Sequence, residues 1–237
     1  MNSLERFKAK LTGQPPTWAD RNIRMVAFGD SVTQGLFINP NTLGNQIYHE
    51  VLRRKLAARY LDRTFSMVNA GVAGETTTQG LARIQGDVLD HRPDLVIVCF
   101  GLNDSCAGEA GEDLFRRNLT KIVRRLLLKT AVILMTPNMM LRRKIPGLSP
   151  AWNQTQKQLM HIQSRGGLTC YVEIIRQVAA HTGTPLADAY AEWMKRDAAG
   201  EDVTCMLFLN HPNAEGHRIF AKVLHKTFRR ILRADLS

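Results

Sequence analysis

Two short segments far apart in the chain contain residue types that together can perform nucleophilic chemistry. Ser31 follows Gly29 and Asp30 at the end of an apolar run, where a tight turn into a helix would expose its hydroxyl and aim a backbone N–H at a developing oxyanion. His211 lies in a second polar segment, residues 210–217, just before the last helical pattern. Serine is a weak nucleophile unless a neighbouring base takes its proton, and neutral imidazole has a suitable pKa. We therefore predict Ser31 as the nucleophile and His211 as the general base.

Both residues also have simpler interpretations. Gly-Asp-Ser is a common turn sequence, and Ser31 considered alone would be a helix N-cap. The presence of a suitable histidine favours the catalytic interpretation. Of the two histidines in the second segment, His217 falls inside a helical pattern and is predicted to be structural. His211 precedes Pro212, where helix is disfavoured, and is the better candidate for a loop base.

Four blocks of the chain, in this order, resemble those of the GDSL-type, or SGNH, hydrolase family. The nucleophile block is residues 29–31, the second block is residues 69–76, the third is residues 101–104 and the last is residues 211–213. Each block alone is a weak signal, whereas four in the right order are specific. The resemblance covers most of the chain.

The resemblance implies a serine esterase that works through an acyl-serine intermediate. It assigns the oxyanion hole to the backbone N–H groups of Ser31 and Gly74 and to the side-chain amide of Asn103. These groups suit the chemistry, because glycine lets the backbone approach closely and the amide is an uncharged donor. Asp30 and Asp104 accompany these residues, and we expect them to fix the loop backbones through hydrogen bonds. No cofactor and no metal ion is required.

The position three residues before His211 departs from the family pattern. Many relatives have an acid there that orients the imidazole, whereas this chain has Phe208. The nearest upstream acids are Glu201 and Asp202. A backbone carbonyl, a water molecule or a distant carboxylate such as Asp188 could hold the ring instead, although Asp188 is expected to be a cap or loop residue.

The chemical residues follow apolar runs that alternate with helical patterns, as in βαβ units. The predicted strands are residues 23–28, 65–70, 95–100, 131–136 and 185–189. The predicted helices include residues 44–61 and 112–128, a segment around residues 171–178 and the last helix around residues 220–231. This pattern predicts a flavodoxin-like three-layer α/β/α sandwich with a five-stranded parallel sheet and its site at the carboxyl ends of the strands. We predict one hydrolase domain over residues 21–237, preceded by an N-terminal extension of residues 1–20.

The segment of residues 138–167 is long for a connection in a compact domain. It is predicted to be either a lid or binding loop, or an irregular helical connection. Its Met and Leu residues could contact a substrate or pack beneath the loop. The cationic residues 142–144 within it weakly favour an anionic leaving group or headgroup.

Composition sets broad limits on the class of protein. The chain has 237 residues and a formal net charge of +11, which suits an anionic partner, but much of the excess lies opposite the apolar stripe of residues 112–128 and is predicted to be a solvated helix face. No nucleic-acid-binding motif is present, so no nucleic-acid partner is expected. The four cysteines form neither a disulfide framework nor a metal-ligand spacing. No segment has the length and apolarity of a membrane span or signal peptide, which predicts a cytoplasmic protein without stable membrane insertion. The sequence does not indicate an oligomeric state.

Several functions remain open at this level. Within the enzyme interpretation, the small-molecule ester could be an acetylated carbohydrate, a lysophospholipid, a thioester or another acyl ester, because all need the same oxyanion chemistry. A non-catalytic module that binds an anionic ligand is the alternative from another class, motivated by Phe208 and the positive charge. Glycosidase chemistry by Asp30 and Asp104 is less favoured, since it explains neither Ser31 nor His211.

Overall fold

A parallel five-stranded sheet forms the centre of the computed structural model, which describes residues 1–36 and 44–233. The strand order is β2-β1-β3-β4-β5, with every neighbouring pair parallel. The strands are β1 Asn22–Gly29, β2 Thr64–Gly71, β3 Leu95–Cys99, β4 Ala131–Met135 and β5 Leu186–Ala187. This is the flavodoxin-like order, and it confirms the predicted fold class.

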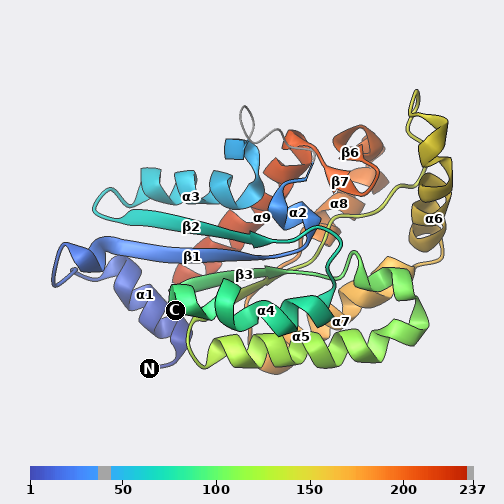
Figure 1. The fold of residues 1–237 in the computed structure, drawn as a ribbon. Coiled ribbons are helices and arrows are strands. Elements are labelled where there is room, and N and C mark those ends of the chain that lie inside the picture. The colour runs from blue at the N-terminus through green and yellow to red at the C-terminus, as the bar shows by residue number, and fades with distance from the viewer. Residues whose placement is uncertain (37–43, 234–237) are drawn as a thin grey trace.

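Most of the helices lie in two layers, one on each face of the sheet, and α6 (Asn153–Ser164) stands beyond the carboxyl ends of the strands (Figure 1). The helices are α1 Ser3–Thr12, α2 Ser31–Gln34, α3 Tyr48–Arg59, α4 Thr77–Asp87, α5 Glu112–Leu127, α6 Asn153–Ser164, α7 Gly167–Thr182, α8 Ala189–Ala198 and α9 Ala214–Arg233. Neighbouring strand residues point to opposite faces, so Met25 of β1 packs in one core and Val26 in the other. The first core contains side chains of α1, α3, α8 and α9, and the second those of α4, α5 and α7.

The register aligns the carboxyl ends of the three strands that precede the candidate residues. Gly29 at the end of β1 pairs with Gly71 of β2 on one side and with Cys99 of β3 on the other. A Cβ on Gly71 would clash with the backbone of Thr33 and Gln34. Glycine is therefore needed where α2 passes over the second block. The loops after β1, β2 and β3 therefore leave the sheet side by side.

The N-terminal residues contribute to the core. Phe7 and Leu11 of α1 are buried in the first core, and the ring of Phe7 meets Phe228 of α9 edge-on at 5.7 Å. Lys10 also forms an ion pair with Asp94 at 2.8 Å. Residues of the predicted extension thus pack against the sheet domain.

The segment of residues 138–167 is a helical connection. Met139, Met140 and Leu141 are buried in the first core, and the segment continues through the short helix Pro150–Trp152 into α6. The side chain of Gln163 accepts a hydrogen bond from the Met140 backbone at 2.8 Å, which ties α6 back to the start of the connection. The Met and Leu residues at its start are therefore packing residues.

A small antiparallel pair follows α8 and was not predicted. Its strands are β6 Leu207–Phe208 and β7 His211–Pro212, and Phe208 pairs with His211. Leu209 between them has φ of 57°, a left-handed conformation that is uncommon for a non-glycine residue. This turn sets the backbone direction at His211.

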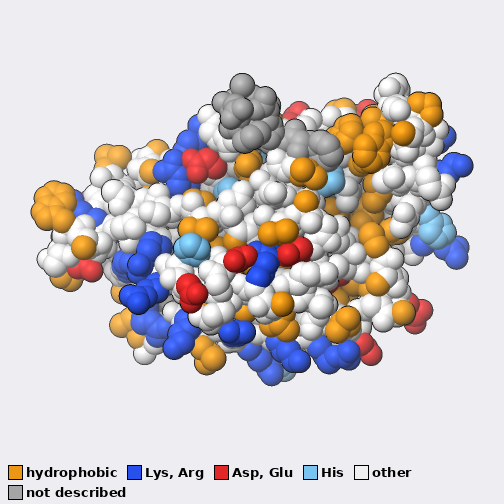
Figure 2. All heavy atoms as spheres, in the orientation of Figure 1, with side chains coloured by type: hydrophobic (Ala, Val, Ile, Leu, Met, Phe, Trp, Pro, Cys, Tyr) orange, Lys and Arg blue, Asp and Glu red, His pale blue; other side chains and the backbone are white. Residues whose placement is uncertain are grey.

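Exposed basic side chains are concentrated on α5. Figure 2 shows Lys and Arg side chains crowded along the lower edge of the molecule, over this helix. The exposed basic residues of α5 are Arg116, Arg117, Lys121, Arg124 and Arg125. Within the described residues, no helix combines the length and the apolarity needed to span a bilayer.

Candidate active site

Ser31 lies at the turn between β1 and α2, where the strand ends and the helix begins. Asp30 is the N-cap of α2, and its carboxylate accepts a hydrogen bond from the Val32 N–H at 2.9 Å. The Ser31 side chain is largely enclosed, with the residue 3% exposed. His211 Nε2 lies 2.9 Å from Ser31 Oγ, although 180 positions separate the two residues. The structure thus brings the predicted nucleophile and base into hydrogen-bond contact.

Desolvation keeps the imidazole of His211 neutral. Burial lowers the pKa of His211 to about 4, and a hydrogen bond with the Phe208 backbone works in the opposite direction. A neutral ring presents an unprotonated nitrogen to the Ser31 hydroxyl at neutral pH. The ring is therefore in the protonation state that a general base needs.

The acids considered from the sequence have other partners. Asp202 forms an ion pair with Arg143 and caps a short helix through the Thr204 N–H. Glu201 pairs with Arg196 at 2.9 Å.

Asp188 caps α8 and receives hydrogen bonds from Thr136 and Arg176, as expected for a cap. The positive charge of residues 142–144 is also partly neutralised, because Arg142 forms an ion pair with Asp197. The predicted preference for an anionic group at residues 142–144 is weakened accordingly.

The side chain of Phe208 packs on the helical connection of residues 138–167. Its ring meets Trp152 edge-on, with the ring centroids 6.1 Å apart and an interplanar angle of 80°. Figure 2 shows hydrophobic side chains gathered on the surface between β6 and α6. The aromatic residue that replaces the family acid thus joins this connection to the strand pair that carries His211.

His217 is structural, as its place in the helical pattern indicated. It is fully buried in α9, and its Nδ1 accepts a hydrogen bond from the Tyr48 N–H at 3.4 Å. The Tyr48 hydroxyl bonds Thr33 Oγ1 at 2.9 Å, and His49 Nε2 lies 3.1 Å from the Thr33 carbonyl. These contacts fix α2, and with it Ser31, against α3 and α9.

Besides Ser31, the predicted oxyanion residues Gly74 and Asn103 lie on two adjoining loops. Asn103 Nδ2 donates to the carbonyl of Glu75 at 2.9 Å, which holds its amide next to Gly74. An amide NH₂ has two hydrogens, so one remains for a substrate oxygen. Gly74 has φ of 78°, and a Cβ there would face open space, so the left-handed backbone and not crowding favours glycine.

The side chain of Asp104 also links these two loops. Its Oδ1 accepts hydrogen bonds from the Thr77 N–H at 2.9 Å and the Thr77 hydroxyl at 2.6 Å. Burial raises the pKa of Asp104, while the bonds from Thr77 lower it. Burial also raises the pKa of Asp30 to about 7, the Val32 N–H opposes this shift, and the charge of Asp104 adds to it. Both aspartates hold loop backbones, as expected.

Arg83 of α4 is a site residue that the sequence did not reveal. Its guanidinium donates to the carbonyls of Gly29 at 3.0 Å and Ala70 at 2.9 Å, the ends of β1 and β2. It also binds the carboxylate of Glu75 at 2.5 Å, in the loop that carries Gly74. It also pairs with Asp87 at 3.0 Å. Two of these four acceptors are backbone carbonyls, which no residue pattern reveals. It links the nucleophile turn to the oxyanion loop.

No cluster for a metal ion is present in the described ranges, 1–36 and 44–233. None of their groups of three or more His, Cys, Asp or Glu side chains is arranged to hold one. The fold is an α/β/α sandwich, and the Ser31–His211 contact lies at the carboxyl edge of its parallel sheet, where folds of this class carry their ligand sites.

The chain belongs to the GDSL-like Lipase/Acylhydrolase family, whose model matches residues 27–219. Membership identifies it as an ester-hydrolysing enzyme and confirms the resemblance found in the sequence. Two curated relatives are similar in sequence. One is the uncharacterized lipoprotein YqeF of Bacillus subtilis, 25% identical over 193 residues that cover 73% of each chain. The other is the esterase TesA of Pseudomonas aeruginosa, 28% identical over 47% of this chain and 52% of that protein.

Among solved structures, the fold is similar to that of Axe2, an acetylxylan esterase from Geobacillus stearothermophilus. The TM-score is 0.68 with 21% sequence identity, over 86% of this chain and 93% of Axe2. Solved variants in which a serine, an aspartate or a histidine of Axe2 is replaced are described as catalytic mutants, and that aspartate precedes the histidine by three residues.

Proposed function

We propose that this chain is a serine esterase in which Ser31 attacks the ester carbonyl and His211 is the general base. The observation that carries the proposal is the 2.9 Å contact between His211 Nε2 and Ser31 Oγ. The contact is within hydrogen-bond reach of a proton transfer. The low pKa of His211 supports the same role, because it keeps the ring unprotonated.

The proposed reaction has two halves. His211 takes the hydroxyl proton as Ser31 Oγ bonds to the carbonyl carbon, and the negative charge that forms on the carbonyl oxygen is stabilised by the N–H groups of Ser31 and Gly74 and the amide of Asn103. The C–O bond to the alcohol then breaks, and His211 gives its proton to the departing alcohol. In the second half, His211 takes a proton from water, the hydroxide adds to the acyl-serine, and the acid leaves as Ser31 regains its proton.

The Phe208 backbone has the orienting role in this proposal. A ring nitrogen that donates to a carbonyl leaves the other nitrogen free to accept the Ser31 proton, so this bond selects the required tautomer. A carbonyl carries no full charge, and it stabilises the imidazolium less than the aspartate that Axe2 has at the corresponding spacing. We expect a working base of reduced strength.

Replacement of the nucleophile tests the proposal. Ser31→Ala should lower kcat for a short-chain chromogenic ester by ~10⁴-fold or more and abolish labelling by a fluorophosphonate probe. Ser164→Ala, which removes an exposed hydroxyl at the end of α6, is the control and should leave both signals unchanged. Thermal melting should show that both variants are folded. Undiminished turnover by folded Ser31→Ala would exclude Ser31 as the nucleophile.

The acyl and alcohol groups of the substrate are addressed by the same assay with other esters. Acetylated xylo-oligosaccharides, esters of increasing acyl length, a lysophospholipid and an acyl thioester cover the alternatives that share this chemistry. The substrate with the highest kcat/KM identifies the class. If none is turned over and no serine probe reacts, while the protein binds an anionic ligand, the result favours a non-catalytic binding module.

A further inference from the structure

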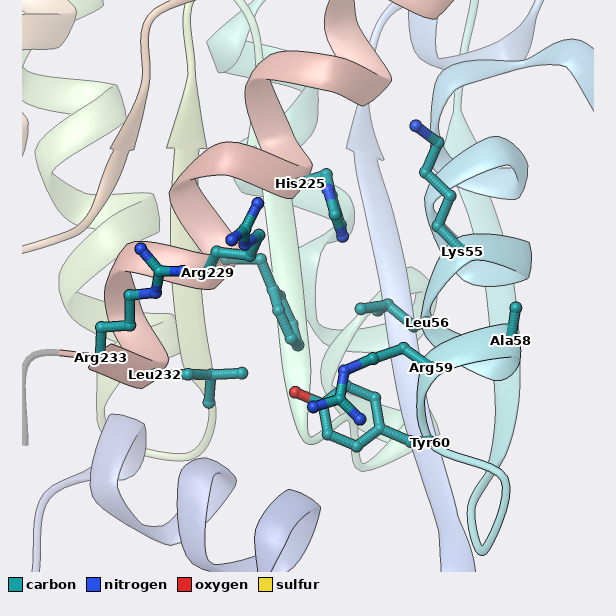
Figure 3. Close-up of a pocket in the computed structure, with 10 residues that line it drawn as sticks. Lys55, Leu56, Ala58, Arg59, Tyr60, His225, Arg229, Leu232 and Arg233 are labelled. Atoms are coloured by element: carbon teal, nitrogen blue, oxygen red, sulfur yellow. The ribbon is translucent and has the colours of Figure 1, made fainter. Parts of the chain in front are cut away.

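A pocket of about 620 Å³ lies between α3 and α9, away from the candidate active site. It is lined by Lys55, Leu56, Ala58, Arg59, Tyr60, His225, Phe228, Arg229, Leu232 and Arg233. Figure 3 shows Arg59 extending from α3 toward α9 and His225 projecting from α9 toward α3. His225 follows His211 by 14 positions, most of them in α9, which at 1.5 Å per residue places the pocket ~20 Å from the base. The two sites are separate.

The rim of this pocket is strongly cationic. Lys55, Arg59, Arg229 and Arg233 are all exposed, and none of them has an ion-pair partner among residues 1–36 and 44–233. No Asp or Glu of the described residues lines the pocket. Other arginines of the chain commonly pair with carboxylates, as Arg53 does with Glu50 on the same helix. The four charges at the rim are thus uncompensated.

The positive surface continues along α9 beyond the pocket. An adjoining hollow of about 510 Å³ shares Lys55 and adds Arg54, Arg218 and Lys222. The basic residues of α9 in the two hollows, at positions 218, 222, 225, 229 and 233, recur every three or four residues and so share one helix face. No acidic side chain of the described residues lines this second hollow either.

The floor of the pocket is apolar. Leu56 and Phe228 are buried beneath the cations, and Leu232 and Tyr60 are partly exposed beside them. Burial lowers the pKa of His225, and the charges of Lys55 and Arg229 lower it further, which is the effect of an unneutralised positive field. A pocket of this size, with an apolar floor and a few converging charges, has the character of a small-ligand site.

We propose that the α3/α9 pocket binds an amphiphile that carries a phosphate group. Arginine forks match phosphate oxygens bidentately, and a phosphate with up to two charges would compensate the rim where a single carboxylate would not. The apolar part of the ligand would lie on Leu56, Phe228 and Leu232. The phosphate can belong to a lipid headgroup or to a soluble compound, and the same chemistry recognises both.

Decyl phosphate, inorganic phosphate and two kinds of vesicle are the probes that test this proposal. Calorimetric titration of the full chain should show decyl phosphate binding more tightly than inorganic phosphate, with affinity falling as sodium chloride is added. Sedimentation with phosphatidylcholine vesicles, with and without phosphatidylglycerol, separates the sources. Binding to phosphatidylglycerol vesicles identifies a headgroup site, and binding of decyl phosphate alone identifies a soluble ligand.

Matched double variants connect the binding to the pocket. Lys55→Ala with Arg229→Ala should weaken binding ~10-fold or more, because the two lost charge-assisted contacts together weaken it by at least about that factor. Lys121→Ala with Arg117→Ala removes the same charge from the exposed face of α5 and should leave the affinity unchanged. Lys55→Gln with Arg229→Gln repeats the test with longer side chains in case the alanine pair unfolds. Hydrolysis of an uncharged ester by these variants should equal that of the wild type, which separates this proposal from the proposed esterase function.

Three results would overturn the proposal. The first is that neither decyl phosphate nor anionic vesicles bind to the protein. The second is that the pocket variants and the α5 variants weaken the binding of decyl phosphate equally. The third is that the protein binds a single-stranded RNA and none of the phosphate probes.

Discussion

The pH dependence of turnover gives the most direct test of how His211 is held. Burial lowers the pKa of this imidazole to about 4, and the opposing contact comes from a backbone group. The base must be neutral to accept a proton, so kcat/KM should fall only as pH drops through that value. At about pH 5, a histidine with this pKa is ~90% neutral, whereas one with the ordinary value of 6.5 is only ~3% neutral. The ratio of kcat/KM at pH 5 to that at pH 8 should therefore be about 0.9 and not about 0.03.

The assay is a kcat/KM profile with a neutral chromogenic ester across that range. Circular dichroism at each pH is a necessary control, because burial also lowers the pKa of His49 to about 4 and that of His217 to about 3. Their neutral forms stabilise the fold above about pH 6.5, and this stability is lost as pH falls toward the folded values. An acid limb centred at 6.5 or above, with the fold intact, would refute desolvation as the dominant effect, and a limb well above 6.5 would indicate a carboxylate near the ring.

Three further predictions follow from the contacts of the site. Asn103→Ala should lower kcat by ~10²–10³ with little change in KM, and an unchanged kcat would remove its amide from the oxyanion hole. Arg83→Ala should lower kcat ~10-fold or more while KM changes little, and Arg83→Lys or added guanidinium should partly restore kcat. A loss of stability in Arg83→Ala without any change in kcat would make Arg83 merely structural. The Asp30 pKa is raised from 3.8 to about 7, so its contribution to stability is fully present below the lower value and lost as pH rises through the upper one. Urea unfolding should therefore show the wild type weakened relative to Asp30→Asn by ~1.4 kcal/mol for each pH unit between about 4 and 7, with little further change above that range, and parallel curves at about pH 5 and pH 8 would contradict this.

The sheet was predictable because its strands are buried on both faces. A run such as residues 95–98 is continuously apolar, which leaves a parallel strand between two helical layers as the natural interpretation. The parallel arrangement then requires the segments after β1, β2 and β3 to meet at one edge. Ser31, Gly74 and Asn103 follow those strands, so their proximity could be expected without coordinates.

The surroundings of the base could not be read from the sequence in the same way. The β6–β7 pair has only two residues per strand, and Leu209 adopts a left-handed backbone without any glycine or asparagine to indicate it. Phe208 showed that the usual acid was missing but not which group contacts the His211 ring instead, because the contact is with a backbone group. Arg83 was missed in part for the same reason, since two of its four acceptors are backbone carbonyls, which leave no trace in residue types.

The choice between a lid and a helical connection for residues 138–167 also depended on tertiary packing. Met139–Leu141 form a short apolar run with no period that distinguishes burial in the core from exposure at a substrate. Gln163 reaches back to the Met140 backbone across 23 positions, and such a long-range bond has no sequence signature. The structure shows that Met139–Leu141 are buried in the first core, which the sequence periodicity could not predict.

The placement of the two reacting groups has a consequence for biosynthesis. Ser31 is made early, whereas His211 precedes the last helix, which completes the first core through Phe220, Leu224 and Phe228. A nascent chain synthesised only as far as residue 200 would hold the nucleophile and all three oxyanion donors without a base. On the proposed mechanism, hydrolysis would therefore begin only after the segment that carries His211 has been synthesised and has docked on the sheet domain, and arrest of translation before this segment would yield inert protein.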